Sequence, residues 1–119
     1  MLEWLRELVM IEVRARWRNE ASLTRRASFP TDGFPDIGCE CSFDGCPTMI
    51  SLTRAEYETV RGDGATFAIA IHHENPELDR VVVEHERYAV VEKWMREAGV
   101  MARETDPRQR LLLTREDTP

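Results

Sequence analysis

The chain has 119 residues, of which 42% are hydrophobic and 32% are charged, and its formal net charge at pH 7 is −6. This length and composition suit one globular domain with its own apolar core, and they exclude an intrinsically disordered chain or a domain that depends on disulfides. The acidic balance argues against a surface that binds nucleic acid over its whole extent, since phosphate binding needs a basic face.

The sequence contains no apolar run close to the roughly 20 residues that a membrane-spanning helix needs. The apolar N-terminus is interrupted at helical intervals by Glu3, Glu7 and Glu12, which a secretory signal does not tolerate. We therefore expect a soluble, cytoplasmic protein that has no membrane partner.

Residues 1–21 are predicted to form an amphipathic helix with two neighbouring apolar faces at 3.6-residue periodicity. One face holds Leu2, Leu5, Val9 and Val13, and the other holds Trp4, Leu8, Ile11 and Ala15. One apolar face is enough to dock the helix on its own domain. The second face is equally well explained by deep burial or by contact with a protein partner or a second copy of the chain.

Residues 1–30 are the basic part of the chain, with six arginines against four glutamates. A local basic stripe is conceivable in the series Arg14, Arg16, Arg18, Arg25 and Arg26. Such a series more often marks a solvated helix face, so nucleic-acid binding is the less favoured interpretation.

Residues 22–38 are rich in Ser, Thr, Pro, Gly and Asp and are predicted to be a linker. A compact domain is expected over residues 39–103, followed by a polar tail over residues 104–119. Within that tail, Leu111–Leu113 form an apolar patch that would be either an added edge strand or a docking point.

The first half of the compact domain contains two local signals. Asp44-Gly45 favours a type I′ turn, which predicts a tight hairpin over Cys39–Cys46. After a short strand at Thr48–Leu52, Thr53 and Glu56 form a capping box, which predicts a helix to about Arg61 with Tyr57 and Val60 facing inward.

The second half is predicted to contain three strands and a closing helix. Alternation over Ala65–His73 places Phe67, Ile69, Ile71 and His73 on the core face of a strand. Asn75 is expected to cap a single helical turn, and strands at Arg80–Glu84 and Tyr88–Glu92 should pair. The closing helix would use Val91, Trp94, Met95 and Ala98, and Gly99 could interrupt it. The whole pattern predicts an α+β fold with a small antiparallel sheet and one or two short helices.

All three cysteines lie within eight residues, as Cys39-Glu40-Cys41 and then Cys46. In a reducing compartment such clustering more often indicates metal or redox chemistry than a disulfide. Three thiolates would leave one position of a tetrahedral zinc site to be filled. The spacing is less specific than a pair of C-x2-C knuckles, so a thiol redox switch and unligated structural cysteines remain alternatives.

The three histidines are the natural candidates for a fourth zinc ligand. Neighbouring strand residues point to opposite faces, so at most one of His72 and His73 can face the cysteines. His73 shares its predicted face with the core residues, and we therefore favour Cys39, Cys41, Cys46 and His73 as the ligands of a structural zinc ion. His85 is the reserve ligand.

The stretch from Cys39 to Arg108 resembles a family of small, largely uncharacterised actinobacterial proteins. The resemblance lies in Cys39-Glu40-Cys41, Cys46, Ile50-Ser51-Leu52-Thr53, Glu56-Tyr57-Glu58, Val60-Arg61, Phe67, His73-Glu74, Arg80-Val81-Val82, Tyr88-Ala89-Val90-Val91-Glu92-Lys93 and Thr105-Asp106-Pro107-Arg108. Arg18-Asn19-Glu20-Ala21 is similar to the family's N-terminal helix. The resemblance implies that the cysteines and His73 act together, and it lends no known activity.

These features favour a small zinc-binding protein that acts as a non-catalytic interaction or regulatory module. The main alternative is a redox sensor that uses the three cysteines. A zinc enzyme would need a base beside an open coordination position, and Glu40 and Glu74 are the candidates by adjacency. No phosphate-binding glycine loop, nucleophile elbow or H-E-x-x-H motif is present in the sequence, so catalysis is not the favoured interpretation.

Overall fold

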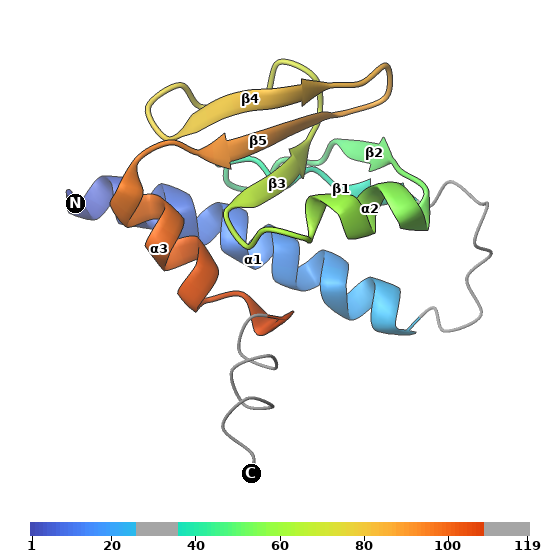
Figure 1. Cartoon of the computed structure of the whole chain (residues 1–119), viewed down its shortest axis with the longest axis horizontal. Coiled ribbons are helices and arrows are strands. Elements are labelled where there is room, and N and C mark those ends of the chain that lie inside the picture. Colours follow the sequence, from blue (N-terminus) through green and yellow to red (C-terminus); the bar gives the residue numbers. More distant parts are fainter. Residues whose placement is uncertain (26–35, 109–119) are drawn as a thin grey trace, which may run out of the picture.

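The structure is a computed structural model that describes residues 1–25 and 36–108. The elements in chain order are α1 (Glu3–Arg25), β1 (Asp36–Gly38), β2 (Met49–Ser51), α2 (Arg54–Val60), β3 (Thr66–Ile69), β4 (Asp79–Glu84), β5 (Ala89–Lys93) and α3 (Arg96–Glu104). The strands form two small antiparallel sheets, with β1 paired to β2 and with the order β3-β5-β4 in the other (Figure 1). The predicted α+β fold is confirmed.

Strands β3 and β5 of the three-stranded sheet are buried on both faces because each face has its own apolar layer. Phe67 and Ile69 of β3 lie with Val91 of β5 in a core cluster that also contains residues of α1 and α3. The alternate residues, Ala68 and Val90, belong to a second cluster with α2, β1 and β2. Period-two alternation thus sends successive side chains of one strand into two different cores.

Helix α1 is an integral part of the first core and runs beneath the strands in Figure 1. Leu5, Val9 and Val13 are buried, as one predicted apolar face requires. On the second predicted face Ala15 is buried and Leu8 and Ile11 are half-buried, whereas Trp4 is 48% exposed. Leu2 is also exposed.

The structure departs from the predicted linker at both of its ends. Helix α1 continues to Arg25, because no proline or glycine interrupts it there and Thr24 donates to the Glu20 carbonyl. At the other end, Asp36–Gly38 is strand β1, with Ile37 opposite Ile50. The Asn19 side chain pairs with both backbone groups of Gly38, which fastens this strand to α1.

Polar side chains of α1 are also buried, which the apolar periodicity did not predict. Glu12, Arg16 and Asn19 are buried. The Arg16 guanidinium donates to the carbonyls of Gly64 (2.6 Å) and Ala102 (2.7 Å), so this arginine is structural. Of the other members of the predicted basic series, Arg14 and Arg18 are exposed, the side chain of Arg25 is not described, and Arg26 lies outside the described residues.

Helix α2 begins as predicted. Thr53 Oγ1 accepts from the Glu56 amide (3.1 Å), and Glu56 Oε1 accepts from the Thr53 amide (2.7 Å), which completes the capping box. Tyr57 and Val60 are buried. The next residue, Arg61, is held by Glu20 of α1 and by Asp106 beyond α3.

Strand β3 is shorter than the predicted Ala65–His73 and ends at Ile69. The predicted pair β4 and β5 is confirmed, and an irregularity in register between Val81 and Val83 marks β4 as an irregular edge strand. Asn75 also behaves as predicted, since its side chain accepts from the Glu77 amide and its carbonyl accepts from the Leu78 amide.

The closing helix starts later than predicted. Val91 belongs to β5, Trp94 precedes the helix, and Met95 is the N-cap of α3. Gly99 does not interrupt the helix; it is buried, and Arg103 and Lys93 are its neighbours at ordinary van der Waals distance. Leu111–Leu113 lie outside the described residues.

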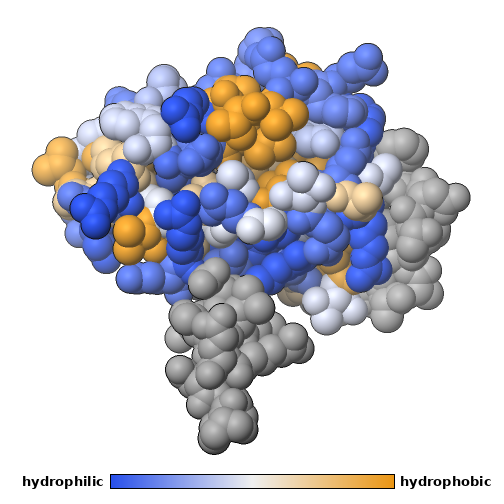
Figure 2. Space-filling model, in the orientation of Figure 1, coloured by the Kyte–Doolittle hydropathy of each residue, from blue (hydrophilic) through white to orange (hydrophobic). Residues whose placement is uncertain are grey.

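Among the described helices, none combines the length and apolar character needed to cross a membrane. The face shown in Figure 2 is mostly hydrophilic, and its broadest apolar patch lies over β4 and β5. Val82 and Val83 of β4 are 42% and 47% exposed.

Candidate metal centre

The three cysteines lie on an irregular loop between β1 and β2, and not on the predicted hairpin of two strands. The Cys46 amide donates to the Phe43 carbonyl (3.1 Å), which closes a turn around Asp44 and Gly45. Gly45 has φ 74°, whereas Asp44 does not have a positive φ. A type I′ turn needs positive φ at both central residues, so that prediction is wrong, and the pattern is typical of type II.

His73 reaches the cysteines from a tight turn, and not from the predicted strand. The His73 amide donates to the Ala70 carbonyl (3.0 Å), and His72 takes the left-handed conformation with φ 71°. The reversal ends the alternation, so Ile71 is 38% exposed and not on the core face. His73 is correctly predicted to lie beside the cysteines, but the physical reason was wrong.

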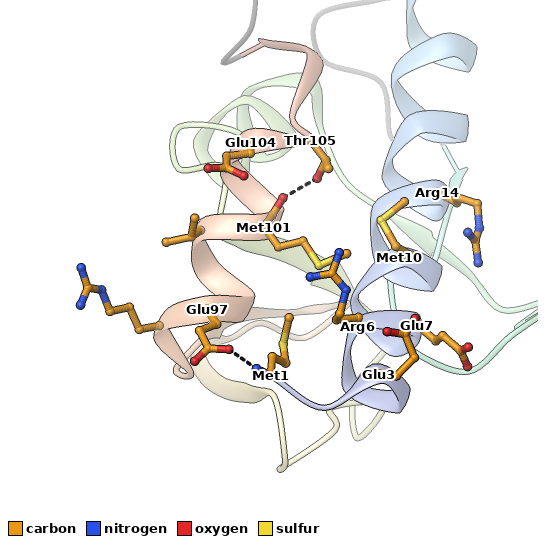
Figure 3. Close-up of a pocket in the computed structure, with 12 residues that line it drawn as sticks. Met1, Glu3, Arg6, Glu7, Met10, Arg14, Glu97, Met101, Glu104 and Thr105 are labelled. Atoms are coloured by element: carbon orange, nitrogen blue, oxygen red, sulfur yellow. Dashed lines mark hydrogen bonds and ion pairs between the residues drawn. The ribbon is translucent and has the colours of Figure 1, made fainter.

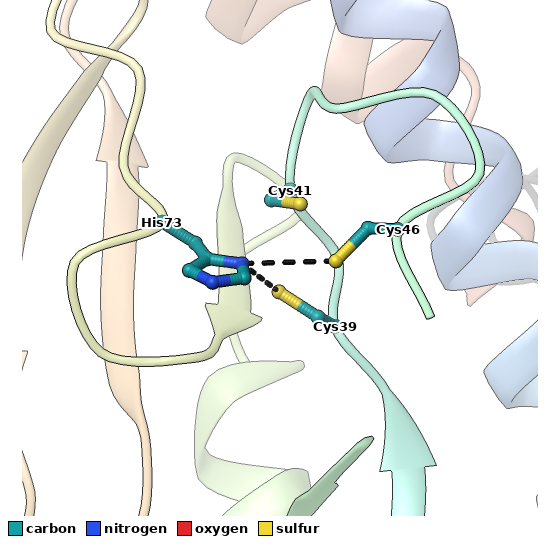
Figure 4. Close-up of side chains that lie close together, drawn as sticks. All are labelled: Cys39, Cys41, Cys46 and His73. Atoms are coloured by element: carbon teal, nitrogen blue, oxygen red, sulfur yellow. Dashed lines mark hydrogen bonds between the residues drawn. The ribbon is translucent and has the colours of Figure 1, made fainter. Parts of the chain in front are cut away.

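Cys39, Cys41, Cys46 and His73 converge, with one donor atom from each lying within 4.8 Å of all the others. His73 Nδ1 is 3.5 Å from Cys39 Sγ and 3.7 Å from Cys46 Sγ (Figure 4). Tetrahedral zinc with Zn–S of about 2.3 Å and Zn–N of about 2.05 Å would place sulfur and nitrogen about 3.5 Å apart. The four side chains therefore form a Cys3His cluster that could hold a metal ion.

The environment of the sulfurs is uneven. Cys39 and Cys41 are buried, and burial raises the pKa of both thiols. The Ala70 amide donates to Cys39 Sγ at 3.1 Å, which favours the thiolate form. Cys46 is less buried; burial opposes its ionisation, but hydrogen bonds with Thr48 and the other two thiols lower its pKa. A bound cation would compensate the cost of burying thiolates here.

Glu40, between two of the cysteines, anchors the loop. Its carboxylate accepts from Tyr57 Oη (2.8 Å), Asn19 Nδ2 (2.9 Å) and the Ala68 amide (3.0 Å). The side chain is fully buried, and burial raises its pKa. Both oxygens are thus engaged by α1, α2 and β3, so Glu40 is a structural residue and a poor candidate for the base of a zinc enzyme.

The remaining predicted alternatives lie elsewhere. The His85 ring stacks on Tyr88 at 4.6 Å, and its Nε2 lies 3.4 Å from Glu56, so it is not brought to the cysteines. His72 is exposed, and Glu74 is not part of the cluster.

The sequence did not predict the two asparagines whose hydrogen bonds hold the cysteine loop in place. Asn75 donates to Ser42 Oγ (3.1 Å) and joins the cysteine loop to the segment that follows His73. Asn19, twenty residues before the first cysteine, holds Gly38 and Glu40. A buried asparagine on the polar side of an amphipathic helix leaves no local signal that could identify it.

Two hollows on the surface of the described residues lie away from the cysteines. A groove with a volume of about 840 Å³ separates α1 from α3, with Met10 and Met101 in its lining (Figure 3). A smaller one lies beside Tyr57 and Arg108. Neither is lined by a member of the Cys3His cluster.

Comparisons with protein-family models, curated proteins and solved structures found no match to this chain. The resemblance to small actinobacterial proteins stays a prediction, and the function has to be argued from the site.

Proposed function

We propose that this protein is a small zinc-binding module in which the ion is structural and the domain serves interaction or regulation. The observation that carries the proposal is the convergence of three thiols and one imidazole on a common point. Soft thiolate donors with an imidazole are a set that suits zinc and not magnesium or calcium.

A metal ion at this point would add a further link between two segments that hydrogen bonds from Ala70 to Cys39 and from Asn75 to Ser42 already connect. Cys39, Cys41 and Cys46 belong to the irregular loop, and His73 belongs to a turn that follows β3. Cys39 and Cys41 are members of the first core cluster, so the free energy of metal binding would add directly to that of folding.

A structural role is favoured over a catalytic one by the number of protein donors. Four side chains complete a tetrahedron, whereas a catalytic zinc keeps a position open for water or substrate. The carboxylate nearest in sequence, Glu40, is already engaged by three hydrogen bonds.

The proposed partner surface is the start of α1. Leu2 (62% exposed) and Trp4 (48% exposed) lie there, and we expect a protein partner or a second copy of the chain to cover them. Light scattering on the wild type and on Trp4→Ser tests the homo-oligomer. If the wild type is an oligomer and Trp4→Ser is a monomer, self-association through this surface is supported. If both proteins are monomers, the partner would have to be a different protein.

The metal is tested by elemental analysis of protein purified without added zinc. We expect one zinc per chain in the wild type and loss of metal in Cys39→Ser, Cys41→Ser and His73→Ala. His72→Ala is the matched control, because His72 is adjacent but exposed. Reduced wild-type protein that is fully folded and metal-free would overturn the proposal.

Redox sensing is a second candidate because Cys46 is more exposed than the two buried cysteines beside it. An oxidant would reach Cys46 first, and a disulfide with Cys39 or Cys41 would remove two of the four metal donors. Mass spectrometry after mild peroxide treatment tests this idea. Retention of both the metal and the free thiols would exclude it.

A further inference from the structure

A second buried cluster, unrelated to the cysteines, lies where β4 begins and β5 ends. Its members are Lys93, Asp79 and Glu12, whose side chains are 0%, 1% and 0% exposed. Lys93 Nζ contacts Asp79 Oδ1 and lies 2.8 Å from Glu12 Oε2. The Phe67 ring, with its centroid 4.7 Å from Nζ, forms an apolar wall. An amine and two carboxyl groups are thus held together in the protein interior.

The backbone fixes the amine against one particular carboxyl group. Asp79 and Lys93 are directly opposite in the antiparallel ladder. The Trp94 amide donates to the Leu78 carbonyl, which makes the 79/93 pair the non-hydrogen-bonded type, in which facing side chains come closest. When two reacting groups of one chain are held side by side in this way, the effective concentration of one at the other is on the order of 10⁵ M or more.

The two oxygens of Asp79 are in different environments. Oδ1 faces the Lys93 amine, whereas Oδ2 accepts a hydrogen bond from the Asn75 amide at 3.2 Å. A backbone donor on Oδ2 would stabilise negative charge that develops there when a nucleophile attacks the carboxyl carbon. Oδ1 is then the oxygen placed to leave.

Glu12 is placed to move protons between the amine and the leaving oxygen. Its Oε2 is hydrogen-bonded to Nζ, and its Oε1 is buried without a partner. Burial raises the pKa of Glu12 to about 8 and outweighs the opposing effect of the Lys93 charge, and the Asp79 charge adds a smaller rise. The carboxyl group can therefore both accept and return a proton near neutral pH.

We propose that Lys93 and Asp79 condense within the folded chain to form an isopeptide bond, with Glu12 as the catalytic proton carrier. Glu12 takes a proton from the Lys93 ammonium, and the free amine attacks the Asp79 carboxyl carbon. The C–N bond forms, the bond from carbon to Oδ1 breaks, and that oxygen leaves as water with the two protons that Nζ loses. An ammonium and a carboxylate become one neutral amide and one water, so no oxidant or cofactor is needed.

The product would also remove a pair of buried charges, which are costly in an apolar interior. The isopeptide bond would link the first residue of β4 to the last residue of β5, two residues that are 14 positions apart in the sequence. Such a covalent link restricts the unfolded chain, as a disulfide does, but resists reduction.

The test is the mass of the full-length denatured and reduced chain. We expect the measured mass to be lower by one water molecule than the mass calculated from the sequence. We also expect the chain to take one amine-specific label instead of two, because Lys93 is the sole lysine and the α-amino group is the only other amine. Lys93→Arg keeps a cation but cannot form the amide, so it should show its full sequence mass. Asp79→Asn should lose ammonia in place of water.

Two further variants separate catalysis from folding. Glu12→Gln, provided that its circular dichroism and metal content match the wild type, should retain its full mass and both labels. Glu92→Gln breaks the exposed Arg80–Glu92 pair on the same two strands and should leave the water loss unchanged. A folded wild type with full mass and two labels would overturn the proposal and leave a purely electrostatic cluster. A mass deficit that persists in Lys93→Arg would also overturn it.

Discussion

The Cys3His cluster and the Lys93–Asp79–Glu12 cluster are both polar groups set into the same apolar core. Cys39 and Cys41 pack in the cluster that contains Phe67, and Lys93 lies over the Phe67 ring. The first is built from three residues within one loop and a fourth 27 residues beyond Cys46. The second joins residues 14 and 81 positions apart. Both need a compensating partner for buried charge. Under the proposed function the first would take that partner from outside, as a metal ion, whereas the second has its charged partners within the chain.

The strongest test of this difference is removal of the metal. Chelation, or Cys41→Ser, should abolish the cooperative thermal transition, because structural zinc contributes about 10 kcal/mol or more to folding and domains are stable by only about 5–15 kcal/mol. Circular dichroism with and without chelator checks this. A domain that melts at the same temperature without metal would show that the charged cluster and the apolar core suffice.

The next test addresses Glu12 through pH. Because burial raises its pKa from 4.5 to about 8, the folded chain binds a proton that the unfolded chain has lost. Its contribution to stability is full below about pH 4.5 and is lost as the pH rises through about 8, at about 1.4 kcal/mol per unit of difference in pKa. Urea denaturation from pH 5 to 9 should show this loss in the wild type and not in Glu12→Gln. The sign is the same whether or not Lys93 and Asp79 are joined, since Glu12 stays buried in both cases.

A smaller effect is expected at the support of the cysteine loop. Asn19→Ala would remove one of the three hydrogen bonds to Glu40 and the side-chain partner of both Gly38 backbone groups, which should cost about 1–3 kcal/mol. Chemical denaturation measures the change. The zinc content should stay at one per chain, because Asn19 is not a donor in the cluster; loss of metal would mean that α1 controls the site itself.

Thr53→Ala should cost about 1 kcal/mol, since it removes one half of the capping box of α2. This helix lies in the second core and contacts neither polar cluster through Thr53, so metal content and the mass of the chain should not change. A change in either would show that the two cores are coupled more tightly than their packing suggests.

The smallest effect is expected at Phe43, which is 71% exposed at the tip of the cysteine loop. Phe43→Ser should change the unfolding free energy by less than about 0.5 kcal/mol. Thermal denaturation provides the measurement, and a shift of several degrees would indicate that the loop tip packs more closely than its exposure implies.

Local signals in the sequence were sufficient for most of the elements and for the three cysteines of the cluster, whereas His73 was chosen from an alternation that ends at Ile69. The capping box at Thr53, the alternation through Phe67 and Ile69, and the cysteine spacing each depend on residues close together in the chain. The failures share a different cause. The start of β1 and the burial of Glu12 are decided by partners far away in the sequence, which are Asn19 for Gly38 and Lys93 for Glu12. Neither periodicity nor composition carries that information.

Helix α1 has a practical consequence for anyone who shortens this chain. Its residues hold β1 through Asn19, α3 through Arg16 and the end of β5 through Glu12. A fragment that starts after α1 would expose the apolar core and would leave Lys93 without the counter-charge of Glu12. The leading helix thus connects three separate elements of the domain, and we expect a fragment without it to lose the cooperative unfolding of the whole chain.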